Sequence, residues 1–160
     1  MATARSRKDA RSSKSTPKIR RPVSGMDVSE VQILSVSDNP EDHEALRHIL
    51  SMQQWNISAA GTCSDAIGHL IAKPSPIVIC EKEISDGTWH EILNQVSRSA
   101  VSSVLIVTSR LADDYLWAEV LNLGGFDVLA KPFNEREVRH VVASAWTAVS
   151  GPARACAAGR

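Results

Sequence analysis

The stretch 76-PIVICEKEISDG-87 places a continuous apolar run directly before a cluster of acidic residues. An apolar, β-branched run without polar alternation is typical of a strand that is covered on both faces, as in a parallel sheet. Pro76 before the run and Gly87 after it are residue types that interrupt regular structure. We therefore expect a central strand at residues 76–80 that carries Glu81 at its carboxyl end.

Four further strand-like runs alternate with helix-like runs outward from this stretch. The strands are predicted at residues 31–37, 55–61, 102–109 and 126–130. The helices are predicted at residues 40–53, 63–72, 87–99, 112–124 and about 135–149. Five successive strand–helix units of about twenty residues each predict an α/β domain with a doubly wound, five-stranded parallel sheet.

Three helix ends carry residues with a defined capping chemistry. Asn39 followed by Pro40 suits an N-cap and the first helical position. Asn134 and Glu137 have the spacing of a capping box, with asparagine in place of the usual serine or threonine. Gly124 follows the fourth helix-like run, where a left-handed C-cap residue is expected.

Length and composition indicate one folded domain with terminal extensions. The chain has 160 residues, of which 43% are hydrophobic. Residues 1–28 are predicted to be a disordered basic tail, residues 29–149 the folded domain, and residues 150–160 a flexible tail. No apolar run is long enough to cross a bilayer, and the basic N-terminus lacks the apolar segment of a secretory signal. We expect a cytoplasmic protein, which also suits three cysteines without metal-ligand spacing.

A net charge of zero hides a basic segment of +7 in residues 1–25 and an acidic remainder of −7. A basic arm of this kind can contact nucleic acid, although a solvated tail is the favoured interpretation. Nucleic-acid binding would require an affinity that falls steeply with salt and disappears when residues 1–25 are deleted.

The predicted strands end in side chains that could form one site. In an open parallel sheet, ligands bind beyond the carboxyl ends of the strands. The side chains expected to meet there are Asp38, Glu81, Thr108 and Lys131. The first loop, 37-SDNPED-42, is acidic and lacks the glycines that would hold a nucleotide or flavin phosphate. Carboxylate and carbonyl oxygens are instead the ligands that Mg²⁺ prefers.

The element order and the strand-end residues resemble the response-regulator receiver domain of two-component signalling over residues 31–148. The segment 131-KPF-133 matches a lysine followed by a proline that is cis in this family, and Thr108 falls on the switch hydroxyl. The segment 81-EKEISDG-87 follows the spacing of the loop after the phosphoacceptor. The resemblance implies a flavodoxin-like sheet with strand order 2-1-3-4-5. It also implies acids that hold Mg²⁺, and a lysine and a hydroxyl that bind the phosphoryl oxygens.

Three positions depart from the family pattern. Glu81 stands where the phosphoacceptor aspartate is expected, Ser37 replaces the first of two acids, and Val128 replaces a switch aromatic residue. The extra methylene moves the Glu81 carboxylate by about 1 Å, and a misplacement of that size can slow a reaction roughly 10²-fold. Loss of a carboxylate at Ser37 predicts a weak or absent Mg²⁺ site. Its expected ligands are Asp38, Glu81 and the backbone carbonyl of Glu83.

These departures leave three hypotheses for Glu81 open. Its carboxylate could act as a permanent partial mimic of phosphorylation near Thr108 and Lys131, with one negative charge against about −1.5 to −2 for a phosphate. It could equally pair with Lys131 as an inert structural remnant. It could also retain phosphorylation, as in a conventional Mg²⁺-dependent phosphoacceptor. We favour a stand-alone, atypical receiver that is not an enzyme and acts as a protein-interaction switch or adaptor.

The expected partners are a histidine kinase, a diguanylate-type enzyme or another signalling protein. Tyr115, Trp117 and Leu121 could form an exposed apolar patch on the fourth helix, and such patches mark partner surfaces. Core packing is an equal alternative for Trp117 and the favoured one for Leu121. The resemblance implies a partner or homodimer surface on helix four, strand five and helix five.

Overall fold

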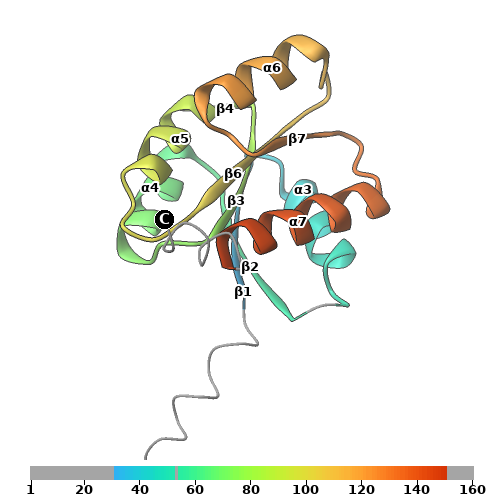
Figure 1. Ribbon diagram of the computed structural model, residues 1–160, viewed down its shortest axis with the longest axis horizontal. Helices are drawn as coiled ribbons and strands as arrows, with labels where there is room; N and C mark the ends of the chain where they lie inside the picture. Colours follow the sequence, from blue (N-terminus) through green and yellow to red (C-terminus); the bar gives the residue numbers. More distant parts are fainter. Residues whose placement is uncertain (1–30, 53, 151–160) are drawn as a thin grey trace, which may run out of the picture. The chain divides into compact units, whose positions relative to one another are not determined.

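A computed structural model describes residues 31–52 and 54–150, so the tails predicted at residues 1–28 and 150–160 lie outside it except for Ser150. The described residues form a five-stranded sheet with the order β2-β1-β3-β6-β7 (Figure 1). Its strands are β1 (Val31–Val36), β2 (Trp55–Ala60), β3 (Ile77–Glu81), β6 (Val104–Ser109) and β7 (Asp127–Ala130). When only these five strands are counted in chain order, the sheet order is 2-1-3-4-5, so the predicted fold class is confirmed.

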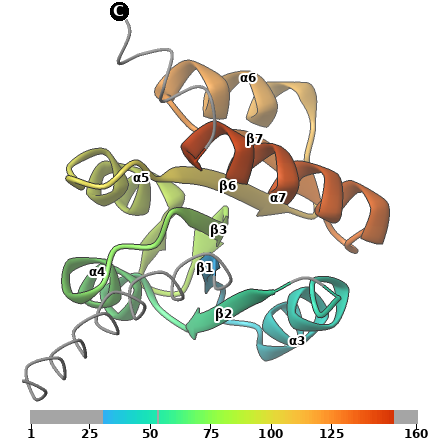
Figure 2. The same cartoon turned by 60° about the horizontal axis from the view of Figure 1, so that its bottom comes forward.

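The described helices cover both faces of this sheet (Figure 2). They are α3 (Pro40–Ile49), α4 (Cys63–Ala72), α5 (Trp89–Ser97), α6 (Asp114–Leu123) and α7 (Glu135–Ser150). α3 contacts α7 on one face, α4 contacts α5 on the other, and α6 packs along β7. None of the helices in the described part of the chain is long and apolar enough to span a membrane.

The capping residues act largely as the sequence predicts. The Asn39 side chain accepts from the backbone N–H of Glu41 over 3.1 Å. The Asn134 side chain accepts from the backbone N–H of Glu137 over 3.0 Å. Gly124 ends α6 with a φ of 109°, a conformation that costs glycine little because it has no Cβ.

A short antiparallel hairpin between β3 and α5 corrects one prediction. β4 (Glu83–Ile84) pairs with β5 (Gly87–Thr88), so residues 87–88 are strand and not the start of the third helix. The helix begins after Thr88 because Thr88 and Glu91 form a capping box, which satisfies backbone N–H groups at its first turn. The hairpin lies directly after the strand that carries Glu81.

The register of the parallel strands decides which side chains share a face, because successive side chains of a strand point to opposite faces. One face carries the alternate apolar residues that pack under α4, α5 and α6. From the strands these are Leu34, Val36, Val78, Cys80, Leu105, Val107 and Val128. Glu81 and Thr108 form the next level of the β3–β6 register and therefore point to the other face, toward α3 and α7.

Candidate functional site

Glu81, Thr108 and Lys131 meet at the carboxyl end of the sheet. Lys131 forms an ion pair with Oε1 of Glu81, and Thr108 Oγ1 donates a hydrogen bond to the same oxygen over 3.3 Å. β7 brings Lys131 to this position, where its backbone N–H donates to the carbonyl of Ser109 over 3.0 Å. The Lys131–Pro132 peptide bond is cis, as the family resemblance implies.

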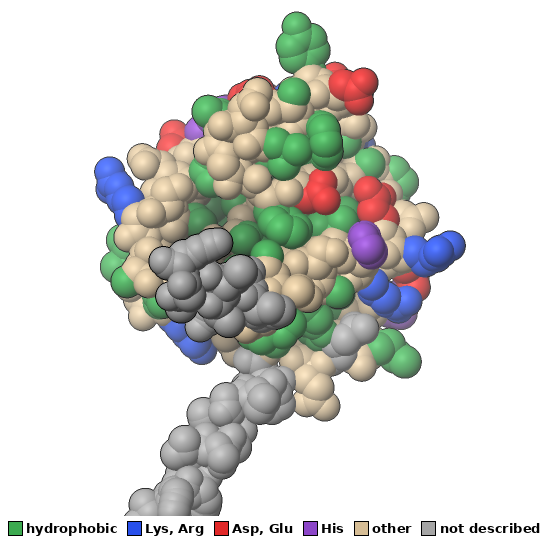
Figure 3. All heavy atoms as spheres, viewed as in Figure 1, with side chains coloured by type: hydrophobic (Ala, Val, Ile, Leu, Met, Phe, Trp, Pro, Cys, Tyr) green, Lys and Arg blue, Asp and Glu red, His purple; other side chains and the backbone are tan. Residues whose placement is uncertain are grey.

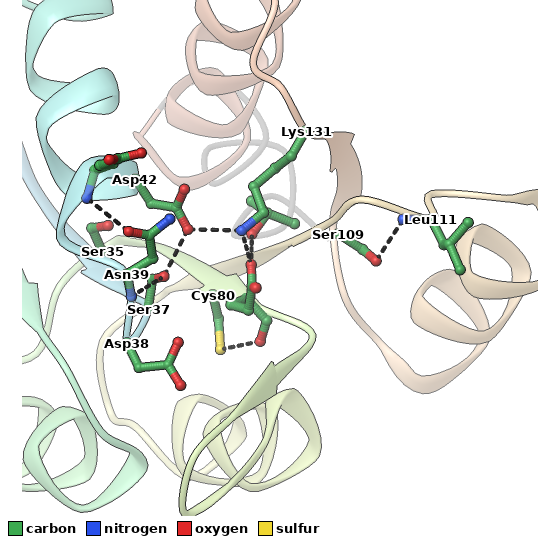
Figure 4. A network of polar contacts seen from close by, with 12 residues as sticks. Ser35, Ser37, Asp38, Asn39, Asp42, Cys80, Ser109, Leu111 and Lys131 are labelled. Carbon is green, nitrogen blue, oxygen red and sulfur yellow. Dashed lines mark hydrogen bonds and ion pairs between the residues drawn. The ribbon is translucent and has the colours of Figure 1, made fainter.

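Asp42 also joins this cluster, although the sequence predicted it only as part of the acidic first loop and not as a partner of Lys131. Lys131 Nζ donates to Asp42 Oδ2 over 2.7 Å, and the Ser37 hydroxyl donates to the same oxygen over 2.7 Å (Figure 4). Asp42 lies in the first turn of α3. The sequence did contain a sign of a buried polar cluster at the end of β1. Ser35 and Ser37 occupy alternate positions there that would otherwise carry apolar core residues.

The cluster is nearly closed to solvent, since the side chains of Lys131, Asp42 and Glu81 are 7%, 12% and 21% exposed. Burial lowers the pKa of Lys131, but the hydrogen bonds and charges of Asp42 and Glu81 more than offset it, so the net pKa is raised. Lys131 is therefore a stable cation that two carboxyl groups share.

A second polar contact ties the start of α3 to β1. His43 Nε2 lies 3.0 Å from the backbone carbonyl of Ser37, and Nδ1 lies 2.8 Å from the Ser35 hydroxyl. A carbonyl oxygen can only accept, so Nε2 carries the proton and Nδ1 accepts from Ser35. Burial lowers the pKa of His43, which favours this neutral form. The buried imidazole thus holds the first turn of α3, and Asp42 with it, against the end of β1.

Asp38 lies apart from the cluster. Its exposed carboxylate accepts from the backbone N–H of Ser85 over 3.1 Å, in the turn of the β4–β5 hairpin. Figure 4 shows Asp38 below Ser37, on the opposite side from Asp42, as expected for consecutive residues at a strand end. Of the four side chains expected at one site, Glu81, Thr108 and Lys131 are therefore in contact, whereas Asp38 is not part of the cluster.

The residues expected to hold magnesium do not assemble into a site for it. Glu81 and Asp42 are both engaged by Lys131, and Asp38 points to the hairpin. Glu83 is exposed and pairs with Thr88 in the hairpin. Across residues 31–52 and 54–150, no group of three or more His, Cys, Asp or Glu side chains could hold a metal ion. The three carboxylates of Asp38, Asp42 and Glu81 do not converge on one centre, so this donor set does not fit the near-octahedral oxygen coordination of Mg²⁺.

The loop after Glu81 has its own anchor. The carboxylate of Asp86 accepts from the backbone N–H groups of Cys63 and Ser64 over 2.6 and 3.1 Å, at the start of α4. These hydrogen bonds lower the pKa of Asp86. Burial, with help from Asp86 and Glu91, raises the pKa of the Cys63 thiol to about 11, so Cys63 is not a reactive thiolate.

Comparison with known proteins identifies the family. A family model described as the response regulator receiver domain matches residues 33–143. The chain belongs to the response-regulator receiver family. No curated protein matches this receiver domain significantly.

Solved structures of receiver domains share its fold. One is the signal receiver domain of a Vibrio parahaemolyticus protein described as a Luxo repressor, with 18% identity, a TM-score of 0.70, and 75% of this chain and 92% of that chain covered. Another is a two-component response regulator from Clostridium difficile, with 21% identity, a TM-score of 0.68, and 76% and 99% covered. A third is the receiver domain of an HD domain-containing protein from Pseudomonas fluorescens, with 20% identity, a TM-score of 0.65, and 72% and 94% covered.

The receiver domain presents apolar side chains on and beside α6, next to acidic ones (Figure 3). The exposed ones are Leu111, Tyr115, Trp117, Leu121 and Leu123, at 73%, 84%, 49%, 38% and 52%. The favoured prediction that Leu121 packs in the core was therefore wrong, since its position on α6 turns it outward from the buried Leu116. Val128, at the position of the switch aromatic residue, is buried beneath this helix.

Proposed function

We propose that this receiver domain acts as an atypical protein-interaction switch or adaptor whose conformation is held by Glu81 instead of by phosphorylation. The observation that carries the proposal is that one carboxylate oxygen of Glu81 contacts both Lys131 and Thr108. In the family these are the amine and the hydroxyl that bind phosphoryl oxygens. A carboxylate supplies one negative charge, part of the −1.5 to −2 or so that a phosphate would bring.

The Thr108 contact favours the phosphorylation mimic over the inert remnant. A structural remnant would need only the pair between Glu81 and Lys131, which neutralises both groups. The hydrogen bond from Thr108 additionally couples β6 to the Glu81 carboxylate, and the loop after β6 leads into α6. The charge of Glu81 is thereby linked to the helix that carries the exposed apolar side chains.

Two observations disfavour the alternative, a conventional Mg²⁺-dependent phosphoacceptor. The carboxylate of Glu81 extends one methylene further than that of an aspartate, and its Oε1 is already shared by Lys131 and Thr108. Phosphoryl transfer depends on positioning and on neutralising charge, usually with metal ions. Asp38, an acid expected to hold such an ion beside Glu81, is directed to Ser85 in the hairpin.

Intact-mass spectrometry tests whether Glu81 accepts a phosphoryl group. The parent protein, Glu81→Asp and Ser37→Asp/Glu81→Asp are incubated with Mg²⁺ and acetyl phosphate, and the double variant restores the acids that the family pattern expects. We expect no added phosphoryl group on the parent protein and an added phosphoryl group on at least one of the two variants. Phosphorylation of the parent protein at Glu81 would overturn the proposal in favour of the conventional phosphoacceptor.

A double-mutant cycle separates the mimic from the remnant. The free energy of unfolding is measured by urea denaturation for the parent, Glu81→Gln, Thr108→Val and the combined variant. The mimic predicts a coupling energy between the two side chains of about 0.5–3 kcal/mol. Additive effects would mean that Glu81 and Thr108 act independently, as expected of the remnant.

Receivers act by contact with histidine kinases and other signalling proteins, and we propose that this domain uses α6, β7 and α7 for partners or for a second copy. Sedimentation velocity over a range of concentrations tests the homodimer, with Leu121→Lys on α6 as the disrupting variant. Ile71→Lys is the matched control, because Ile71 is 67% exposed on the distant helix α4. Association that only Leu121→Lys abolishes supports the homodimer, and a monomer at every concentration counts against it.

A further inference from the structure

Five side chains from separate elements form one continuous chain of polar contacts around Lys131. In order, they are Ser37, Asp42, Lys131, Glu81 and Thr108. Asp42 reaches the ammonium from α3, while Glu81 reaches it from the end of β3. Lys131 is thus held from two sides, and the second side depends on a helix residue.

The small side chain of Ser37 allows a helix residue, Asp42, to contact the Lys131 ammonium. Its side chain is buried, and its hydroxyl donates to the Asp42 oxygen that also accepts from Lys131. A carboxylate at the position of Ser37 would compete for the space that Asp42 fills. A serine leaves that space open and supplies a donor that fixes the arriving carboxylate.

The first turn of α3 is built to hold Asp42. A carboxylate near a helix N-terminus is stabilised by the exposed backbone N–H groups and the helix dipole. His43, the next residue, is hydrogen-bonded to Ser35 and to the backbone of Ser37, which fixes the turn against β1. Asp42 is therefore oriented before Lys131 binds it, and little side-chain entropy is lost in forming the ion pair.

We propose that Asp42 is the positioning residue that holds Lys131 against Glu81, and that Ser37 and Asp42 work as a matched pair. This proposal rests on the proposed function, because it concerns how the Glu81–Lys131 contact is maintained without phosphorylation. The pair provides Lys131 with a second carboxylate from within the chain, at a site whose donor set does not suit a divalent cation.

Nuclear magnetic resonance of the Lys131 ammonium tests the positioning role. A buried ammonium held by two carboxylates exchanges its protons slowly with water, which gives a resolved ¹H–¹⁵N signal of the Nζ group. Asp42→Asn keeps the shape of the side chain and a partner for Ser37, and we expect loss of this signal. Asp38→Asn is the matched control, because Asp38 binds Ser85 and not Lys131, and it should retain the signal.

The exchanged variant Ser37→Asp/Asp42→Ser returns the carboxylate to the strand end and keeps a hydroxyl beside it. We expect this variant to regain the Lys131 signal that Asp42→Asn loses, and it remains informative if Asp42→Asn fails to fold. Retention of the signal in a folded Asp42→Asn protein would overturn the positioning role. Failure of the folded exchanged variant to regain it would overturn the matched pair.

These outcomes can be told apart from failure of the proposed function. Phosphorylation of the parent protein would refute the switch held by Glu81, yet the response of the Lys131 signal to Asp42→Asn would still stand. Conversely, if the parent protein stays unphosphorylated and Asp42→Asn leaves the Lys131 signal unchanged, only the positioning role of Asp42 is refuted.

Discussion

The Thr108 hydroxyl donates a hydrogen bond over 3.3 Å to Oε1 of Glu81, its register partner on the neighbouring strand β3. Their side chains share a face because parallel strands in register present paired residues to the same side of the sheet. The candidate site therefore follows from the alignment of β3 with β6, which places residues distant in the chain at one level.

Thr108→Val should test the energetic weight of this contact. Valine keeps the shape of the buried threonine but removes the donor, so we expect the free energy of unfolding to fall by roughly 1.5–3 kcal/mol, as for a hydrogen bond to a charged group. Urea denaturation measures the change. Thr147→Val is the control, because its hydroxyl bonds within the exposed face of α7. Equal effects of the two substitutions would show that the contact with Glu81 adds nothing.

Lys131→Met should be among the most damaging substitutions in this receiver domain. It leaves the carboxyl groups of Asp42 and Glu81 buried without their shared cation, and breaking such a buried pair costs about 3–5 kcal/mol. The free energy of unfolding at neutral pH measures this loss. A change below 1 kcal/mol would mean that water or a relaxed geometry satisfies both acids.

The same residue predicts how stability changes at alkaline pH. The pKa of Lys131 is raised in the folded protein, whereas an unfolded lysine has a pKa of about 10.4. Its contribution is therefore complete below about pH 10 and is lost as pH rises through the raised folded value. Comparison with Lys131→Met isolates this contribution, because other groups titrate in both proteins. Parallel stability curves above pH 10 would argue against the raised pKa.

His43 predicts a loss of stability in mild acid. Its pKa is lowered in the folded protein, whereas an unfolded histidine titrates near 6.5. Below about pH 6.5 the unfolded chain binds more protons, so stability falls as pH falls toward the lowered folded pKa. The variant His43→Gln should show a flatter dependence between pH 7 and pH 5, whereas His48→Gln, at an exposed position, should behave like the parent. Matching slopes in all three proteins would exclude the prediction.

We expect alanine substitutions at two glycine positions to change stability in opposite directions. A Cβ at Gly87 would clash with Glu91 Oε1 and lie 2.8 Å from Cys63 Sγ, so Gly87→Ala should displace the capping glutamate and destabilise by roughly 1–3 kcal/mol. A Cβ at Gly68, inside helix α4, would have no neighbour within 4 Å, and Gly68→Ala should stabilise by roughly 0.5–1 kcal/mol. Thermal denaturation checks both signs, and a stabilising Gly87→Ala would contradict the crowding at the hairpin.

Much of the fold could be predicted because its signals are local. The buried run before Glu81, the N-cap at Asn39 and the C-cap at Gly124 each depend on a few consecutive residues. The β4–β5 hairpin was missed because two-residue strands leave no periodic pattern. Its Gly87–Thr88 segment also adjoins a helix whose hydrophobic pattern overlaps it.

The family and the convergence of Glu81, Thr108 and Lys131 could be anticipated from the sequence, because strand ends in a parallel sheet meet at one edge. The serines of β1 indicated a polar partner but not that it is Asp42, because this role depends on the approach of α3 to Lys131, 89 positions away in the chain. The departure of Asp38 toward the hairpin likewise depends on which face each strand-end side chain takes. Sequence alone determined the order of elements and the chemical types at the sheet edge. Only the tertiary structure decided which carboxylates share the lysine, because a short-range ion pair depends on ångström-scale placement that no linear pattern contains.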